Sequence, residues 1–192
     1  MNRRKAIRRI LLAGGAGIAG FAGYKWYDLK KTPDIGYLDR HKDLIAVLAE
    51  TIIPATDTPG AREAGVQDFI VVMVRDCATV KEQNQFIDGL KDVDSSAYSH
   101  YKRPFVRCTE EQRVAILTHF EKEATVFSAG VAAKVQNMLL GRPFFTLLKE
   151  YTTQGYCTSE LGATRGLVYL PIPGKYQGCI DLLPGQRAWA TK

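Results

Sequence analysis

The chain has 192 residues, enough for one domain of ordinary size once a leader of about 25 residues is set aside. Its formal net charge of +6 would suit a nucleic-acid-binding protein, but the charge is concentrated at one end. Residues 1–31 hold eight basic side chains and one acidic side chain, whereas the rest of the chain holds 18 basic and 19 acidic side chains. Because that remainder is nearly neutral, we expect no nucleic acid among the partners.

The N-terminal segment has the layout of an export signal. Basic residues that include Arg3 and Arg4 precede an apolar, glycine-rich run over residues 10–21. A pair of arginines before a weakly hydrophobic segment is typical of twin-arginine signals, which direct folded proteins across the bacterial inner membrane. Arg8 and Arg9 form a second pair, and either pair can be the one that is recognised. We therefore expect a periplasmic protein that engages the twin-arginine translocase.

Two other interpretations of this segment have less support. A membrane-spanning helix needs about 20 apolar residues, and this run is shorter and diluted by glycines. Residues 15–20 match G-x-G-x-x-G, the dinucleotide-binding fingerprint, but an arginine cluster precedes them and Pro33 interrupts the helix that should follow. The nearest small-x-small pattern for cleavage is at residues 20–22, and the sequence leaves open whether the signal is cleaved or kept as a tether.

Four cysteines, Cys77, Cys108, Cys157 and Cys179, lie in the part that we expect to be exported. An even number in an oxidising compartment suggests disulfides, and four cysteines allow three pairings. From proximity in the sequence we predict the pairs Cys77–Cys108 and Cys157–Cys179, with a free or intersubunit cysteine as the alternative. The chain has no C-x-x-C and no C-x-x-C-H, so neither a redox pair nor an attachment site for its own haem c is indicated.

The middle of the chain is predicted to be helical. Apolar residues recur at helical spacing over residues 44–52 and stop at Pro54, and a turn-rich loop is expected over residues 55–60. A short apolar helix is expected over residues 66–74. These patterns place the loop between two helices.

Capping boxes predict the starts of two more helices. Thr79 with Glu82 opens a helix that should end near Gly89, and Thr109 with Gln112 opens the next.

Two further helices complete the predicted bundle. One covers residues 129–140 with Gly141 past its end, and Pro143 can occupy the first turn of the other, which should reach Gly155. The local patterns together predict an all-α fold.

The last forty residues differ from the rest. From Gln154 onward glycine and proline recur every few residues, so no helix of useful length is expected. The segment is poor in charge and holds Tyr156, Tyr169, Tyr176 and Trp189, which is unlike a disordered linker. These side chains must be buried on the bundle or on another protein, as in the centres of protein interfaces. We thus expect a signal and linker (1–31), a helical domain (32–155) and an irregular, aromatic-rich tail (156–192).

No catalytic constellation is evident in the sequence. The three histidines, His41, His100 and His119, are far apart, and none has a second ligand at the spacing of a metal site. No serine lies in a G-x-S-x-G motif. We therefore expect no catalytic, cofactor-binding or metal-binding residues in this chain, and a protein exported in the folded state without its own active site is expected to belong to a larger complex.

Two motifs resemble those of a known family. The first is ETIIPATDTPGAREAGV at residues 50–66, and the second comprises GY at 155–156, TSE-x-GAT at 158–164 and PIPGKYQGC at 171–179. On these motifs the chain resembles the gluconate 2-dehydrogenase subunit 3 family over essentially its whole length after the leader.

The resemblance implies a non-catalytic small subunit of a periplasmic FAD-dependent sugar or alcohol dehydrogenase. In such complexes a large subunit similar to glucose-methanol-choline oxidoreductases holds the FAD, and a cytochrome c subunit with haem c often accepts the electrons. The small subunit typically bears the twin-arginine signal, and the flavin subunit, which has no signal of its own, is exported in complex with it. Two alternatives are a transient export chaperone for that flavoprotein and a self-sufficient periplasmic enzyme whose site is assembled from distant residues. The sugar substrate and the oxidised carbon depend on the flavin subunit.

The candidate contacts with the flavin subunit lie in two places. The loop contributes Asp57 and Pro59, for which a helix-connecting turn is an equally well supported interpretation. The tail contributes Tyr156, Arg165, Tyr169, Pro171, Pro173 and Tyr176.

Overall fold

The computed structural model describes residues 31–126 and 141–169, together with residues 172, 174, 175, 178, 179, 181 and 184–189. Within these residues the fold is all-α, as predicted, and the only β pairing is a single bridge between Val168 and Trp189. The α-helices are α2 (Gly36–Arg40), α3 (Lys42–Ile52), α4 (Val66–Val72), α5 (Val80–Tyr101), α6 (Glu110–Val126) and α8 (Phe144–Thr158). Short turns of other helical types are η1 (Met73–Cys77), η2 (Phe105–Arg107) and η3 (Gly162–Gly166).

Both predicted capping boxes are confirmed. The Thr79 hydroxyl accepts a hydrogen bond from the Glu82 amide, and the Glu82 carboxylate accepts one from the Thr79 amide at 3.1 Å. At the start of α6, the Thr109 amide donates to Gln112 Oε1 at 3.1 Å, and the Gln112 amide donates back to Thr109 Oγ1 at 3.4 Å. Each box satisfies amide groups that have no partner within the first turn of the helix. The helix predicted over residues 129–140 lies outside the described residues.

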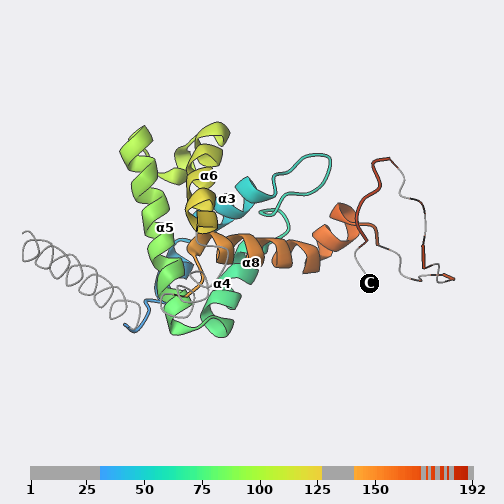
Figure 1. Cartoon of the computed structure of the whole chain (residues 1–192), viewed down its shortest axis with the longest axis horizontal. Helices are drawn as coiled ribbons and strands as arrows, with labels where there is room; N and C mark the ends of the chain where they lie inside the picture. Colours follow the sequence, from blue (N-terminus) through green and yellow to red (C-terminus); the bar gives the residue numbers. More distant parts are fainter. Residues whose placement is uncertain are drawn as a thin grey trace, which may run out of the picture.

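Helix α8 runs through the middle of the bundle (Figure 1). It contacts α3, α4, α5, α6 and η3. Its buried positions repeat every three or four residues, which aligns them along one broad face. They are Phe144, Phe145, Leu147, Leu148, Tyr151, Thr152, Gly155 and Tyr156. The core therefore forms around α8 rather than between two equal layers.

Helix α5 does not end near Gly89, as we predicted, but continues to Tyr101. Gly89 is a contact point instead, because a Cβ atom there would overlap the ring of Phe144. The Phe144 ring lies between Phe86 of α5, at 5.2 Å between centroids, and Phe120 of α6, at 6.0 Å. The missing side chain thus lets α8 approach α5 closely, and the glycine serves packing rather than termination.

The end predicted for α8 at Gly155 is wrong for the same reason. The helix continues to Thr158, and a Cβ atom on Gly155 would come within 2.8 Å of the Phe69 ring of α4. Beyond Gln154, where we expected no helix of useful length, α8 is completed and the five-residue turn η3 follows after a short break at Ser159. The irregular segment therefore starts near Leu167, later than predicted.

The four cysteines are free in the structure, so the predicted disulfides Cys77–Cys108 and Cys157–Cys179 find no support in it. Cys108 is buried, and its thiol donates to the carbonyl oxygen of Pro104 at 3.6 Å, whereas Cys77 is exposed at the end of η1. Burial raises the pKa of the Cys108 thiol, which makes it a small apolar core residue rather than a reactive one. Proximity in the sequence did not place the two side chains in the same environment.

Arg142 joins the start of α5 to α8. Its guanidinium lies 2.6 Å from Glu82 and 2.6 Å from Glu150, and it also reaches the hydroxyl of Tyr151 at 3.5 Å. Burial alone would raise the pKa of the Glu82 carboxyl, but hydrogen bonds from Arg142 and Thr79 outweigh it and hold that pKa below its usual value. Glu82 therefore acts both as a helix cap and as the inner partner of an ion pair.

We predict that Gly89→Ala destabilises the fold by about 2 kcal/mol, because overpacking against the Phe144 ring exceeds the gain of about 1 kcal/mol in helix propensity. Urea denaturation followed by circular dichroism measures the change. Ser99→Ala, on the exposed face of the same helix, is the control and should be neutral or slightly stabilising. An unchanged or raised midpoint in Gly89→Ala would contradict the close approach of α8.

We predict that Glu82→Gln lowers the free energy of unfolding near neutral pH by about 1–2 kcal/mol. Because the folded-state pKa of Glu82 is depressed, its stabilisation is complete above the ordinary carboxyl pKa of about 4.3 and is lost as the pH falls through the folded-state value. The stability difference between the original protein and Glu82→Gln should therefore shrink on acidification, as measured by denaturation over a pH series. Glu121→Gln, which removes an exposed pair with Lys149, should change stability little.

Candidate functional site

The loop between α3 and α4 is held in place by the carboxylate of Glu50. Oxygen Oε1 accepts a hydrogen bond from the Ala55 amide at 2.9 Å, and Oε2 accepts one from the Arg62 amide at 2.9 Å. Gly60 lies directly against this carboxylate, where any Cβ atom would overlap it. One side chain from the last turn of α3 therefore fixes both ends of a loop that has no regular structure of its own.

Tyr156 connects this loop to the C-terminal part of the chain. Its hydroxyl donates to the carbonyl oxygen of Pro59 at 2.8 Å, across 97 positions of sequence. The side chain is only 6% exposed, and Gly166 of η3 lies against the ring and hydroxyl on another side. Tyr156 was predicted to contact a partner, but the structure buries it within its own chain. The loop, the end of α8 and η3 therefore form one surface.

Arg187 attaches the returning tail to the same surface. Its Nη1 donates to the carbonyl oxygen of Arg165 at 2.7 Å, and its Nη2 donates to Asp57 Oδ2 at 2.8 Å. A single guanidinium thus spans η3 and the loop. We call this pair of contacts the Arg187 clamp.

The three segments enclose a shallow cleft of about 490 Å³. Its walls bring together three of the predicted contact residues, Asp57, Pro59 and Arg165, which are distant in the sequence. The complete lining is Ala55, Thr56, Asp57, Thr58, Pro59, Glu63, Thr164, Arg165 and Arg187. This cleft with the adjoining tail is the candidate site.

The charges of the clamp are exposed, with 44% of the Arg187 side chain and 78% of the Asp57 side chain accessible. Hydrogen bonds from the Thr56 hydroxyl and from the backbone amide of Asp57, followed by the charge of Arg187, lower the pKa of Asp57, so this carboxylate is ionised at neutral pH. Exposed ion pairs contribute about 0–1 kcal/mol to stability. The clamp therefore sets the position of the tail more than it stabilises the bundle.

The other predicted contact residues have different positions. Tyr169 is 48% exposed just after η3, and Arg165 is exposed beside the cleft. The remaining candidates lie outside the described residues: Pro171, Pro173 and Tyr176 in the tail, and Arg3 and Arg4 in the leader.

Sequence reasoning missed Glu50 and Arg187. Glu50 stands just before a loop rich in proline and glycine, where a carboxylate can accept unpaired amide hydrogens, and this signal was available. Arg187 is an isolated cation in a charge-poor tail, and no local pattern indicates that it pairs with a residue 130 positions away.

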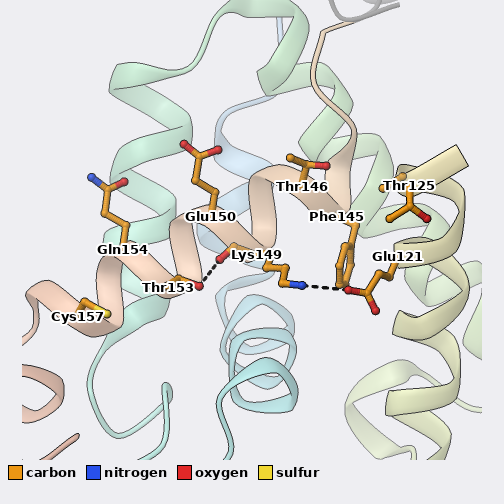
Figure 2. A pocket seen from close by; sticks show the side chains of 10 residues that line it. Glu121, Thr125, Phe145, Thr146, Lys149, Glu150, Thr153, Gln154 and Cys157 are labelled. Carbon is orange, nitrogen blue, oxygen red and sulfur yellow. Dashed lines mark hydrogen bonds and ion pairs between the residues drawn. The ribbon is translucent and has the colours of Figure 1, made fainter. Parts of the chain in front are cut away.

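A second hollow lies between α6 and α8, with a volume of about 690 Å³ (Figure 2). Phe145 and Glu121 lie at one end, and Cys157 lies at the other end of the exposed face of α8. Lys149 spans the groove between them and pairs with Glu121 at 3.0 Å. The charged side chains of this groove are engaged in ion pairs, Lys149 with Glu121 and Glu150 with Arg142.

The described residues show no metal-binding group of three or more His, Cys, Asp and Glu side chains. His41 and His100 each have Nδ1 2.9 Å from the carbonyl oxygen four residues earlier, and His119 lies 3.5 Å from Glu123. Each histidine is thus engaged within its own helical segment. Among the helices that the structure describes, none is long and apolar enough to cross a membrane.

We predict that Tyr156→Phe lowers the free energy of unfolding by about 1 kcal/mol, because the Pro59 carbonyl loses its buried hydrogen bond. Hydrogen exchange of the Ala55 and Arg62 amides should also become faster if Tyr156 holds the loop in place. Tyr98→Phe, at a position that is 51% exposed on α5, is the control and should alter neither quantity. Equal effects of both substitutions would show that the hydrogen bond does not stabilise the loop.

Comparison with known proteins gives a family but no individual relative. No curated protein matches the chain, and no solved structure matches it. The family described as gluconate 2-dehydrogenase subunit 3 matches residues 39–174, a range that includes α3, the Glu50 loop, α8 and η3. This range is well over half of the chain. The protein therefore belongs to the gluconate 2-dehydrogenase subunit 3 family and is an accessory subunit of a dehydrogenase complex.

Proposed function

We propose that this chain is the non-catalytic small subunit of a periplasmic, FAD-dependent sugar dehydrogenase of the gluconate, glucose or glucoside type. In this proposal it carries the folded flavin-binding subunit through the twin-arginine pathway and then remains bound to it. The family match over residues 39–174 is the observation that carries the proposal. The partner is a flavoprotein of the glucose-methanol-choline type, and a cytochrome c subunit is a further member of the complex.

The physical logic of export supports this division of labour. FAD is available in the cytoplasm, so the flavin subunit must fold and bind FAD before it crosses the membrane. Only a pathway for folded cargo can then move it, and one signal for the whole complex is sufficient. The paired arginines at Arg3 and Arg4 and the apolar run behind them supply such a signal.

The distribution of charge and apolar surface also supports a subunit role. The basic charge is concentrated in residues 1–31, so the remainder has no strong field to direct it to nucleic acid. Exposed aromatic side chains lie beside the cleft in a tail with few charges. Such surfaces are typical of the centre of a protein interface.

We assign the cofactors to the other subunits, FAD to the flavin subunit and haem c to the cytochrome. The side chains of the candidate site are suited to protein contact: a clamp of Arg187 with Asp57, an exposed arginine at 165 and an exposed tyrosine at 169. The small subunit would therefore contribute the export signal, an interface and stability to the complex.

We predict that Arg3→Lys/Arg4→Lys abolishes delivery of the flavin subunit to the periplasm. The test co-expresses this chain with the glucose-methanol-choline-type flavoprotein of the same genome and measures dye-linked dehydrogenase activity and bound FAD in the periplasmic fraction. Both should fall to background in the variant, because a lysine pair is a poor substitute for the arginine pair in this signal. Arg8→Lys/Arg9→Lys is the matched control and shows which pair is read.

Co-purification separates this proposal from its rivals. A stable subunit interface buries more than about 1,000 Å² and should survive affinity purification of the exported flavoprotein. A flavoprotein that is exported only with this chain but purifies without it would identify a transient chaperone. Turnover by this chain alone would identify a self-sufficient enzyme, and unchanged export in the arginine variant would overturn the carrier function.

A further inference from the structure

Trp189 is presented at the surface by a backbone that contacts of Arg187 and Ala188 hold in place. Its side chain is 44% exposed, although tryptophan is the largest apolar residue and is usually covered in a folded domain. Tyr169, which is 48% exposed, follows Val168, the residue that forms a β bridge with Trp189. The bridge therefore places Tyr169 and Trp189 on adjacent backbone segments, beyond the end of α8.

A turn and two contacts determine the position of Trp189. Pro184 and Gly185 form a turn, in which Gly185 adopts a left-handed φ of 74° that glycine accommodates without strain. The Arg187 clamp then attaches the chain to η3 and to the Glu50 loop. Finally, the carbonyl oxygen of Ala188 accepts a hydrogen bond from the Val168 amide at 2.8 Å.

The guanidinium of Arg187, two residues before Trp189, is engaged in contacts within the chain. The Arg187 guanidinium donates to both the Arg165 carbonyl and the Asp57 carboxylate. At this position the described residues therefore offer a partner the Trp189 indole rather than the Arg187 charge. A rigidly placed, half-exposed tryptophan is the side chain most enriched among the residues that dominate binding energy at protein interfaces.

We propose that Trp189 is an anchor that inserts into an apolar pocket on the flavin-binding subunit, and that Arg187 is the residue that positions it. This inference rests on the proposed function, because the family match is what makes a dehydrogenase subunit the occupant of this surface. The pocket should be lined by apolar side chains and should offer one hydrogen-bond acceptor to the indole N–H.

The location of Trp189 suggests what the anchor contributes. The family match ends at residue 174, whereas the turn, the clamp arginine and Trp189 lie at residues 184–189. The anchor thus belongs to a part of the chain that the family description does not cover. We infer that it matches this small subunit to its own flavin subunit rather than to flavin subunits in general.

The first test measures the affinity of variants for the co-expressed flavoprotein by biolayer interferometry. Trp189→Ala should weaken binding by about 30-fold or more, and Trp189→Phe should recover a large part of the loss, because it keeps an aromatic ring. Tyr98→Ala removes a similarly exposed aromatic side chain from α5 and should change the affinity by less than about threefold. Thermal unfolding of each free variant should match that of the original chain, which separates lost contact from lost folding.

The second test asks whether Arg187 acts through Trp189. Arg187→Ala should weaken binding by about tenfold in the original chain but by less than about threefold when Trp189 is already alanine. Equal effects of Arg187→Ala in both backgrounds would show that it contacts the partner directly, and this result would overturn the positioning role.

Binding by the original chain and binding by Trp189→Ala test different claims. If the original chain does not bind the flavoprotein at all, the proposed function fails. If the original chain binds and Trp189→Ala binds as tightly as Tyr98→Ala, the complex exists but Trp189 is not its anchor.

Discussion

The close packing of α8 against its neighbours is the constraint on which the rest of the structure depends. Its N-terminal part meets α5 where Gly89 admits the Phe144 ring, and its C-terminal part meets α4 where Gly155 admits Phe69. Because α8 is in contact at both ends, its last turn has a fixed position, and Tyr156 on that turn reaches Pro59 in the loop after α3. The geometry of the candidate site therefore follows from packing in the core, since rigid elements place loops more precisely than loops place themselves.

Much of the fold was predictable because its signals are local. The two capping boxes, the end of α3 before Pro54 and the all-α class each depend on residues within a few positions of one another. The ends of α5 and α8 were not predictable in this way. A glycine weakens an isolated helix, but at 89 and 155 it is the absence of a side chain that permits contact with an aromatic ring from a distant helix. Only the tertiary structure distinguishes these two roles of glycine.

The candidate site was predictable in its parts but not in its assembly. The loop at residues 50–66 and the segment from 155 onward were both selected from sequence motifs, and the structure brings Asp57, Pro59 and Arg165 to one cleft. The contacts that join them span about one hundred residues or more and are made by Tyr156 and Arg187. Tyr156 illustrates the difficulty, since a buried tyrosine that supports its own chain and an interface tyrosine have the same sequence signal: an aromatic residue in a charge-poor segment.

The Arg187 clamp contributes little to the stability of the domain. Its contribution is to position the surface beside Trp189 before a partner binds. An exposed pair such as Arg187 with Asp57 contributes little to folding, so its value lies in the geometry that it imposes. If Trp189 were on an unrestrained tail, the entropy lost when the tail becomes ordered would weaken its binding to a partner. A guanidinium that binds two acceptors on rigid elements removes part of that cost before the partner arrives. Under the carrier function that we propose, assembly would have to precede export, and such preorganisation would favour it, because an incomplete complex would leave the flavin subunit behind.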